Sequence, residues 1–215
     1  MTRKIGILGS GQVGQVLANG FLKHGYAVTI GTGNPAKLGD WKYRAGANAH
    51  VGNFEEAATF GDVMVLAVKG DAAVSIIGEL ASVLHGKTVL DTTNPIAEVP
   101  PHQGVLKFFT TLDDSLLERL QQKAPAVHFV KAFNCVGSAR MVNPAFTDGK
   151  PTMFICGDNE AAKNEATQIL EQFGWDVADF GKAESARAIE PLCILWCIPG
   201  FLNNQWTHAF KLLKV

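Results

Sequence analysis

The most constraining feature of the sequence is a glycine motif near its N-terminus. Gly9-Ser10-Gly11-Gln12-Val13-Gly14 fits the pattern G-x-G-x-x-G, and it directly follows the short apolar run 4–8, which predicts a buried strand. Residues 11–24 then carry apolar side chains at helical spacing, and Gly25 stands where a helix commonly ends. A strand, a glycine turn and a helix in direct succession predict the first unit of a Rossmann domain.

Each position of this motif has a physical role in binding a dinucleotide. Gly9 permits the tight turn, Gly11 lets the backbone approach a pyrophosphate without a Cβ between them, and Gly14 lets the helix pack close to the strand. The free N–H groups at the start of the helix attract phosphate charge. We therefore expect Gly9, Ser10, Gly11, Gln12 and Val13 to bind a cofactor, and the alternative is a glycine-rich turn that binds nothing.

The rest of the chain alternates apolar strand patterns with helical ones. Strands are expected at 26–30, 47–51, 62–68, 88–91, 126–133, 152–156 and 175–180, with helices at 54–60, 71–84, from a capping box at 111–114 to 122, and after 159. This order predicts an α/β fold: a Rossmann-type, doubly wound parallel sheet with a short C-terminal helical appendage. We place the NADP-binding domain at 1–182 and the appendage, a helix interrupted at Pro199-Gly200, at 183–215.

The turn after the second strand indicates which nicotinamide cofactor is bound. An NAD site usually places Asp or Glu there to accept from the ribose 2′-hydroxyl, but residues 31–34 read Gly-Thr-Gly-Asn. Thr32 offers a hydroxyl, Asn34 an amide and Lys37 a positive charge, so a 2′-phosphate would not be repelled. The sequence favours NADP over NAD, although the same residues would also serve an ordinary turn.

Further cofactor contacts are expected where the later strands end, because ligands of open α/β sheets gather beyond the carboxyl ends of the strands. These candidate residues are Val68, Lys69, Asn94, Pro95, Ala132 and Asn134. The asparagines could hold ribose hydroxyls or the nicotinamide amide, while Val68 and Pro95 could form an apolar wall for the ring. The competing interpretation of residues 92–94 is an Asx-turn before the proline.

Composition excludes several classes of function. The net charge is −1 and Lys and Arg form no cluster, so no nucleic-acid partner is expected. The apolar run 192–201 is too short to cross a membrane, and a strand that begins at residue 4 leaves no room for a signal peptide. The four cysteines form no CxxC pair, which predicts no metal site and suits the cytoplasm. The six histidines are scattered, and we nominate no catalytic residue.

These blocks together resemble a known family. The sequence is similar to the NADPH:coenzyme F420 oxidoreductase family, which includes the cytosolic reductase domain of metal-reducing membrane proteins. The resemblance spans nearly the whole chain and rests on the segments 7–14, 30–32 with Lys37, 130–134, 155–158 and 186–191. It implies that Ser10 to Val13 contact the phosphates, that Thr32 and Lys37 face the 2′-phosphate, and that Val68, Lys69, Asn94 and Ala132 surround the ribose and nicotinamide.

The resemblance also implies C-terminal helices that help to close the acceptor site and form a homodimer. Two departures matter: the family often has Ser-Arg where this chain has Thr32-Gly33, and residues 92–95 are more polar than in the deazaflavin enzymes. Deazaflavin, flavin and a ferric chelate therefore all stay open as the small-molecule acceptor. The short appendage favours a flat acceptor over a hydroxy acid, which usually requires a large second domain.

The sequence thus predicts an NADP(H)-dependent oxidoreductase that transfers hydride between the nicotinamide and a flat redox acceptor. Such a reaction needs little acid–base assistance from the protein, because the cofactors carry the chemistry. The alternative is a non-catalytic NADP(H)-binding sensor or partner domain. A weaker alternative is reduction of an imine or ketoacid, with the C-terminal helices of a dimer completing the pocket.

Overall fold

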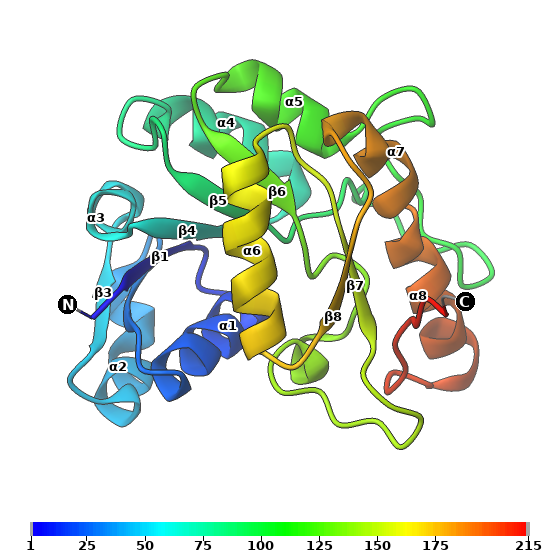
Figure 1. Cartoon of the computed structure of the whole chain (residues 1–215), viewed down its shortest axis with the longest axis horizontal. Helices are drawn as coiled ribbons and strands as arrows, with labels where there is room; N and C mark the ends of the chain where they lie inside the picture. Colours follow the sequence, from blue (N-terminus) through cyan, green and yellow to red (C-terminus); the bar gives the residue numbers. More distant parts are fainter. Residues whose placement is uncertain (1, 214–215) are drawn as a thin grey trace.

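The computed structural model describes residues 2–213 and contains strands that alternate with helices (Figure 1). The strands are β1 (Lys4–Leu8), β2 (Ala27–Gly31), β3 (Ala49–Gly52), β4 (Val63–Leu66), β5 (Thr88–Asp91), β6 (His128–Lys131), β7 (Thr152–Ile155) and β8 (Asp176–Asp179). The α-helices are α1 (Gln12–Lys23), α2 (Gly39–Ala45), α3 (Phe54–Phe60), α4 (Gly70–Leu80), α5 (Leu116–Lys123), α6 (Glu160–Gln172), α7 (Ala186–Ile189) and α8 (Leu192–Asn203). Short 3₁₀ helices are η1 (Pro35–Leu38), η2 (Ser138–Arg140) and η3 (Ala183–Ser185).

Strands β1 to β6 form one parallel sheet in the order β3-β2-β1-β4-β5-β6. From β1 the chain adds β2 and β3 on one side. It then crosses back to the other side of β1 and adds β4, β5 and β6, so the direction of winding reverses between β1 and β4. This is the doubly wound Rossmann arrangement, and it confirms the predicted fold class.

The register of the sheet brings the ends of five strands into one row. Leu8 pairs with Gly31 on one side and with Leu66 on the other, Leu66 pairs with Asp91, and Asp91 pairs with Lys131. The loops that follow these residues therefore leave the sheet at the same edge, where ligands of open α/β sheets bind.

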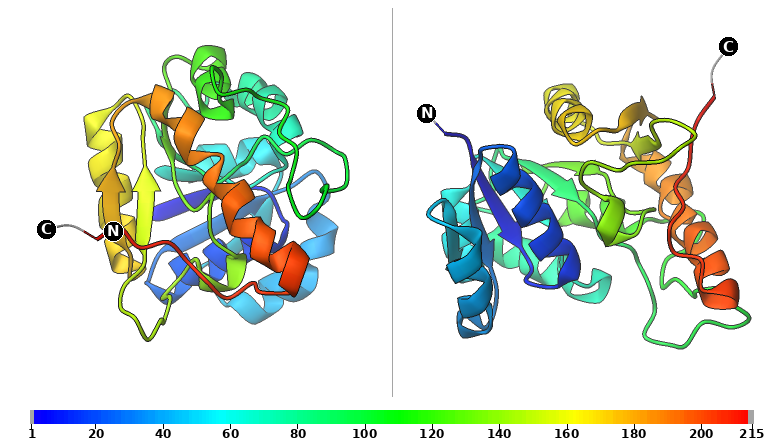
Figure 2. Two further views of the ribbon diagram at one scale, coloured as in Figure 1. Left: turned by 90° about the vertical axis from the view of Figure 1, so that its right-hand side faces the viewer. Right: turned by 90° about the horizontal axis from the view of Figure 1, so that it is seen from below.

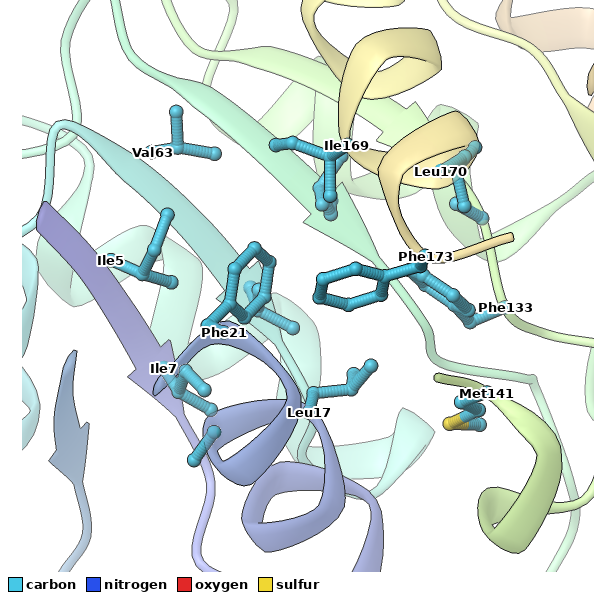
Figure 3. Close-up of a cluster of buried hydrophobic side chains, with 14 of the residues drawn as sticks. Ile5, Ile7, Leu17, Phe21, Val63, Phe133, Met141, Ile169, Leu170 and Phe173 are labelled. Atoms are coloured by element: carbon cyan, nitrogen blue, oxygen red, sulfur yellow. The ribbon is translucent and has the colours of Figure 1, made fainter. Parts of the chain in front are cut away.

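Helices cover both faces of the sheet, as the two further views show (Figure 2). One face packs against α1 and α6, and Figure 3 shows Phe21 of α1 and Phe173 after α6 meeting there, with ring centroids 4.8 Å apart. Both rings are completely buried. Truncation of either to alanine would cost about 3–5 kcal/mol of stability. The other face packs against α3, α4 and α5.

Strands β7 and β8 form a separate parallel pair beside β6. An antiparallel bridge between Lys131 and Cys156 joins the pair to the main sheet. The C-terminal tail, which comes after α8 in the chain, lies beside β7 (Figure 2). There the N–H of Thr152 donates to the carbonyl of Phe210 at 2.8 Å. The chain after α8 is thus held against the Rossmann body.

The predicted start of the helix that ends near residue 122 is wrong. Helix α5 begins after Ser115, which forms a capping box with Glu118, and not at the box predicted for 111–114. The hydroxyl of Thr111 accepts instead from the N–H of Asp113 at 3.3 Å, which closes a local turn. The later start places Leu116 and Leu117 in the core.

The predicted break at Pro199-Gly200 is wrong, because α8 runs through Pro199. A proline removes one hydrogen bond to the carbonyl four residues earlier, here that of Leu195. Leu195 is 54% exposed, so this turn of the helix lies at the surface. The regular α-helix is interrupted instead at Glu190 and Pro191, which separate α7 from α8.

The segment after β2 also holds more structure than a turn. Pro35 opens η1, which leads into α2, and the indole of Trp41 donates to Asn19 Oδ1 at 2.9 Å. Trp41 is buried, so this short helix covers the end of α1.

One helical run, Ala183–Asn203, is long and apolar enough to cross a membrane by length and composition. It has 21 residues, more than the apolar run 192–201 identified in the sequence. Of its most apolar window, 33% is buried, and a single helix of this kind is weak evidence for a membrane span. Arg187 and Glu190 within this run pair with Glu118 and Lys131 of the Rossmann body.

Candidate functional site

The glycine loop between β1 and α1 has the geometry of a phosphate-binding turn. Gly9 has φ +121°, and a Cβ there would overlap the carbonyl oxygen of Ala67, so only glycine fits. A Cβ at Gly14 would overlap the carbonyl oxygen of Gly9, which explains how closely α1 packs on the loop. A Cβ at Gly11 would meet no atom within 4 Å, so the backbone there faces open space.

The first turn of α1 is free to meet an anion. Its N-cap is Gly11, which has no side chain to cap the free N–H groups, and the first turn contains no acidic residue. Gln15 turns its amide back to donate to the carbonyl of Ser10 at 2.8 Å, which holds the loop in place. The positive end of the helix dipole therefore points at the open face beside Gly11.

The turn after β2 is joined to the glycine loop. The hydroxyls of Ser10 and Thr32 lie 2.9 Å apart, and Thr32 Oγ1 also accepts from the N–H of Asn34 at 3.3 Å. Asn34 and Lys37 are exposed beyond this turn. No carboxylate occurs in the segment 31–39, so nothing in that turn would repel a phosphate on the ribose.

Two adjoining pockets open along this edge of the sheet. The first, of about 490 Å³, is lined by Gly9, Ser10, Gly11, Gln12, Val13, Thr32, Phe54, Ala67, Val68, Lys69, Ala72 and Ile76. The second, of about 620 Å³, is lined by Val13, Ala67, Val68, Lys69, Gly70, Asp71, Thr92, Thr93, Asn94, Ile96, Ala97, Glu98, Val99 and Pro100. The two share Val13 and residues 67–69, so they form one groove from the glycine loop to the loop after β5.

The candidate residues from the sequence fall into three groups along this groove. Gly9, Ser10, Gly11, Gln12, Val13, Thr32, Val68 and Lys69 line the smaller pocket, while Asn94 lines only the larger one. Asn34 and Lys37 are exposed beyond the groove, and Pro95, Ala132 and Asn134 are buried behind its wall. His102 lies on the exposed loop 96–108 and lines neither pocket.

Asn94, in the wall of the larger pocket, is hydrogen-bonded to Asn134 behind it. The amide of Asn94 donates to the carbonyl of Asn134 at 2.8 Å, and Asn134 Nδ2 lies 3.2 Å from Asn94 Oδ1. Phe133 has φ +61°, an unusual conformation for a residue with a side chain, which turns Phe133 into the core and Asn134 toward Asn94. The Oδ1 atom of Asn134 has no hydrogen-bond partner in the described part of the chain.

A buried ion cluster behind the pocket was missed from the sequence. Lys131 is completely buried and lies 2.6 Å from Asp91 Oδ2 and 2.9 Å from Glu190 Oε1. Burial acts to lower the pKa of Lys131, but the two carboxylates more than offset it and the pKa lies above its ordinary value. The sequence does hold one sign of this cluster: the apolar strands β5 and β6 each end on a charged residue, Asp91 and Lys131.

The larger pocket carries an ion pair at its surface. Lys69 Nζ lies 3.1 Å from Glu98 Oε1, and both side chains are largely exposed. The hydrogen bond and charge of Glu98, with a further contribution from Asp71, raise the pKa of Lys69. These three are the titratable groups among the residues that line the larger pocket.

The cysteines are free and show no metal-binding arrangement. Burial raises the pKa of Cys135 and of Cys156 to about 12, so both thiols stay protonated at neutral pH. Within residues 2–213, no group of three or more His, Cys, Asp or Glu side chains is placed to hold a metal ion.

The chain has relatives among reductases. Residues 4–95 match the family described as NADP oxidoreductase, coenzyme F420-dependent. Rat metalloreductase STEAP3 is 33% identical over 207 residues, which cover 93% of this chain but 39% of that protein. The F420-dependent NADP reductase of Methanocaldococcus jannaschii is 29% identical over 142 residues, or 64% of this chain and 61% of the reductase. The chain thus spans about two fifths of the metalloreductase.

A solved structure agrees over the full length. The crystal structure of a protein from Arthrobacter sp. FB24, provisionally described as an F420-dependent NADP-reductase, superposes with a TM-score of 0.90, covers 100% of both chains and is 27% identical. Together with the relatives above, it confirms the resemblance stated from the sequence. The chain is thus similar to the coenzyme F420-dependent NADP oxidoreductase family, whose model matches residues 4–95.

Proposed function

We propose that this protein is an NADP(H)-dependent oxidoreductase that passes reducing equivalents to a flat redox acceptor. The observation that carries the proposal is the continuous groove: a pocket of about 490 Å³ at the glycine loop opens into one of about 620 Å³ at the loop after β5. A dinucleotide and a second planar molecule would occupy such a pair of spaces, which adjoin along Val13 and residues 67–69.

The residues present fit the cofactor. The open space at Gly11 and the free first turn of α1 suit a pyrophosphate. Thr32, Asn34 and Lys37 suit a 2′-phosphate, which supports NADP over NAD. When bound, the nicotinamide would supply a hydride, and the protein would supply orientation and a dry apolar surface.

The larger pocket supports a reaction that needs no proton relay. Its walls are mainly apolar, and its titratable groups are an exposed ion pair, Lys69 with Glu98, and Asp71. Hydride transfer to a conjugated ring needs distance and alignment more than a general acid. This supports deazaflavin or flavin as the hydride acceptor more than an imine or ketoacid. A ferric chelate takes single electrons, so its reduction would need a flavin that accepts the hydride and passes on two electrons one at a time.

The decisive test measures NADPH oxidation by the purified protein with riboflavin, FMN, a deazaflavin and ferric citrate as separate acceptors. We expect steady turnover with at least one of them, and weaker turnover with NADH than with NADPH. Tight NADPH binding without turnover on any acceptor would instead support the non-catalytic sensor.

We also propose a homodimer formed through the C-terminal helices, in a cytoplasmic protein. Helix α8 exposes apolar side chains, with Leu195 54%, Phe201 45% and Leu202 57% exposed. Free cysteines suit a reducing compartment. Light scattering after gel filtration should give the mass of a dimer. The double variant Leu195→Glu, Leu202→Glu should give that of a monomer, whereas Tyr43→Glu, on the distant helix α2, should remain dimeric.

A further inference from the structure

The buried cluster of Asp91, Lys131 and Glu190 places two carboxylates and one carbonyl around a single ammonium group. Lys131 Nζ lies 2.6 Å from Asp91 Oδ2 and 2.9 Å from Glu190 Oε1, and it donates to the carbonyl of Thr93 at 2.9 Å. The side chains of Asp91 and Lys131 are 0% exposed and that of Glu190 is 2% exposed. Asp91 Oδ2 makes no hydrogen bond within the described residues, so charge attraction to Lys131 holds this oxygen.

The two carboxylates reach outward in different directions. Asp91 Oδ1 accepts from both the N–H and the hydroxyl of Thr93, at 2.9 and 2.7 Å. Glu190 accepts from the N–H groups of Leu116 and Leu117, each at 3.0 Å, which are the first residues of α5. The excess negative charge of the cluster therefore lies at the positive end of a helix.

One end of this network is the wall of the larger pocket. Thr93 lines that pocket, and the network holds its N–H, its hydroxyl and its carbonyl at once. Asn94, the next residue of the wall, is hydrogen-bonded to Asn134. Asn134 in turn donates to the carbonyl of Ile189 at 2.9 Å.

The other end is the C-terminal helical segment. Ile189 and Glu190 lie where α7 ends, just before α8, and each is linked to the pocket wall by its own route, through Asn134 or through Lys131. No residue of the described segment 183–213 lines either pocket. Two links therefore join the segment to the Thr93–Asn94 wall, while α8 also lies beside Gly104 of the loop 96–108.

We propose that Glu190 is a positioning residue that, through Lys131, holds the Thr93–Asn94 wall of the acceptor pocket. The C-terminal segment then sets the geometry in which the acceptor meets the nicotinamide, although it contacts neither. The predicted effect of Glu190 on turnover rests on the proposed function.

The test compares two variants of helix α7 and its C-terminal end. Glu190→Gln keeps the size of the side chain but removes its charge from the cluster. Arg187→Gln is the matched control, because Arg187 also ties this segment to α5, through Glu118 at 2.6 Å, but has no link to Thr93. We expect Glu190→Gln to lower kcat/KM for the acceptor at least tenfold while the Kd for NADPH stays within twofold. Arg187→Gln should change neither.

A second readout does not depend on turnover. Amide hydrogen exchange at Thr93 should become faster in Glu190→Gln and stay unchanged in Arg187→Gln. If the wild type binds NADPH but reduces no acceptor, the proposed function fails, and the exchange measurement still tests the positioning role.

Two results would overturn the inference. One is equal loss of acceptor kcat/KM in both variants, which would mean that Glu190 only attaches the segment. The other is a folded Glu190→Gln protein with wild-type kinetics and wild-type exchange at Thr93. If Glu190→Gln does not fold, Thr93→Val removes the hydroxyl at the far end of the network. It must then lower acceptor kcat/KM without changing the NADPH Kd, and wild-type kinetics would refute the proposal.

Discussion

The hydroxyl groups of Ser10 and Thr32 lie 2.9 Å apart, which joins the glycine loop to the turn after β2. Ser10 belongs to the segment expected to bind phosphates, and Thr32 to the segment expected to choose between NADP and NAD. Because this hydrogen bond joins the two segments, the residues expected to bind phosphates lie beside those expected to choose the cofactor. Substitutions in the two segments can therefore be compared in the same binding assay.

Replacing Gly11 should separate binding from folding. A Cβ at Gly11 would meet no protein atom within 4 Å, so Gly11→Val should cost about 1 kcal/mol or less of stability, the cost of a poorer N-cap. The side chain would occupy the space proposed for the pyrophosphate, and we expect NADPH affinity to fall more than about tenfold. Fluorescence titration and thermal melting measure the two effects.

Gly9→Ala is the contrasting variant. Gly9 has φ +121° and its Cβ would overlap the carbonyl oxygen of Ala67, so this change should destabilise the fold by about 1–3 kcal/mol. A Gly11→Val protein that binds NADPH as tightly as the wild type would contradict the proposed site.

Lys37 should contribute to the preference for NADPH. Lys37 is exposed one turn beyond Thr32, and its charge can reach a 2′-phosphate but has no partner on NADH. We expect Lys37→Ala to weaken NADPH binding roughly fivefold and to leave NADH binding unchanged. Lys42→Ala, an exposed lysine of α2, is the control. An equal loss of affinity for NADPH and NADH would show that Lys37 does not contact the 2′-phosphate.

Lys131 should be essential for stability. Lys131→Met leaves Asp91 and Glu190 as two buried carboxylates without a cation, and loss of one partner from such a cluster costs about 3–5 kcal/mol. Urea denaturation measures the change. Lys69→Met removes the exposed pair with Glu98 and should leave the midpoint nearly unchanged. A Lys131→Met midpoint close to that of the wild type would mean that the cluster contributes little to stability.

Glu118 should make stability depend on pH in the acid range. Hydrogen bonds from Arg187, with a smaller contribution from Ser115, hold the pKa of Glu118 below its ordinary value of 4.5. Because the folded pKa is depressed, this stabilisation is fully present above the ordinary value and is lost as pH falls through the folded pKa. We expect Glu118→Gln to be less stable than the wild type by about 1 kcal/mol at neutral pH and to lose that difference in acid.

The measurement is a series of urea midpoints for the two proteins from neutral pH downward. A difference that stays constant through the acid range would show that the Glu118 carboxylate is not the source of the effect.

Short-range patterns in the sequence were sufficient for the Rossmann half. The glycine motif and the apolar strand at residues 4–8 act within a few residues of each other, because a turn between a strand and a helix is a local structure. The same holds for Thr88–Asp91, whose bounds as predicted are those of β5. The helix start at Ser115 was misplaced, because Thr111 and Ser115 offer similar capping boxes and only packing of the following leucines separates them.

Only the tertiary structure brought together Asp91, Lys131 and Glu190. These residues lie far apart along the chain, and a charged side chain in a sequence is ordinarily read as exposed. The row of strand ends brings Asp91 beside Lys131, and the end of α7 brings Glu190 to Lys131. The sequence by itself thus determined a dinucleotide-binding loop, because its glycines are required locally. The fold decided what stands behind the acceptor pocket, because a buried charge is stable only where partners from other segments reach it.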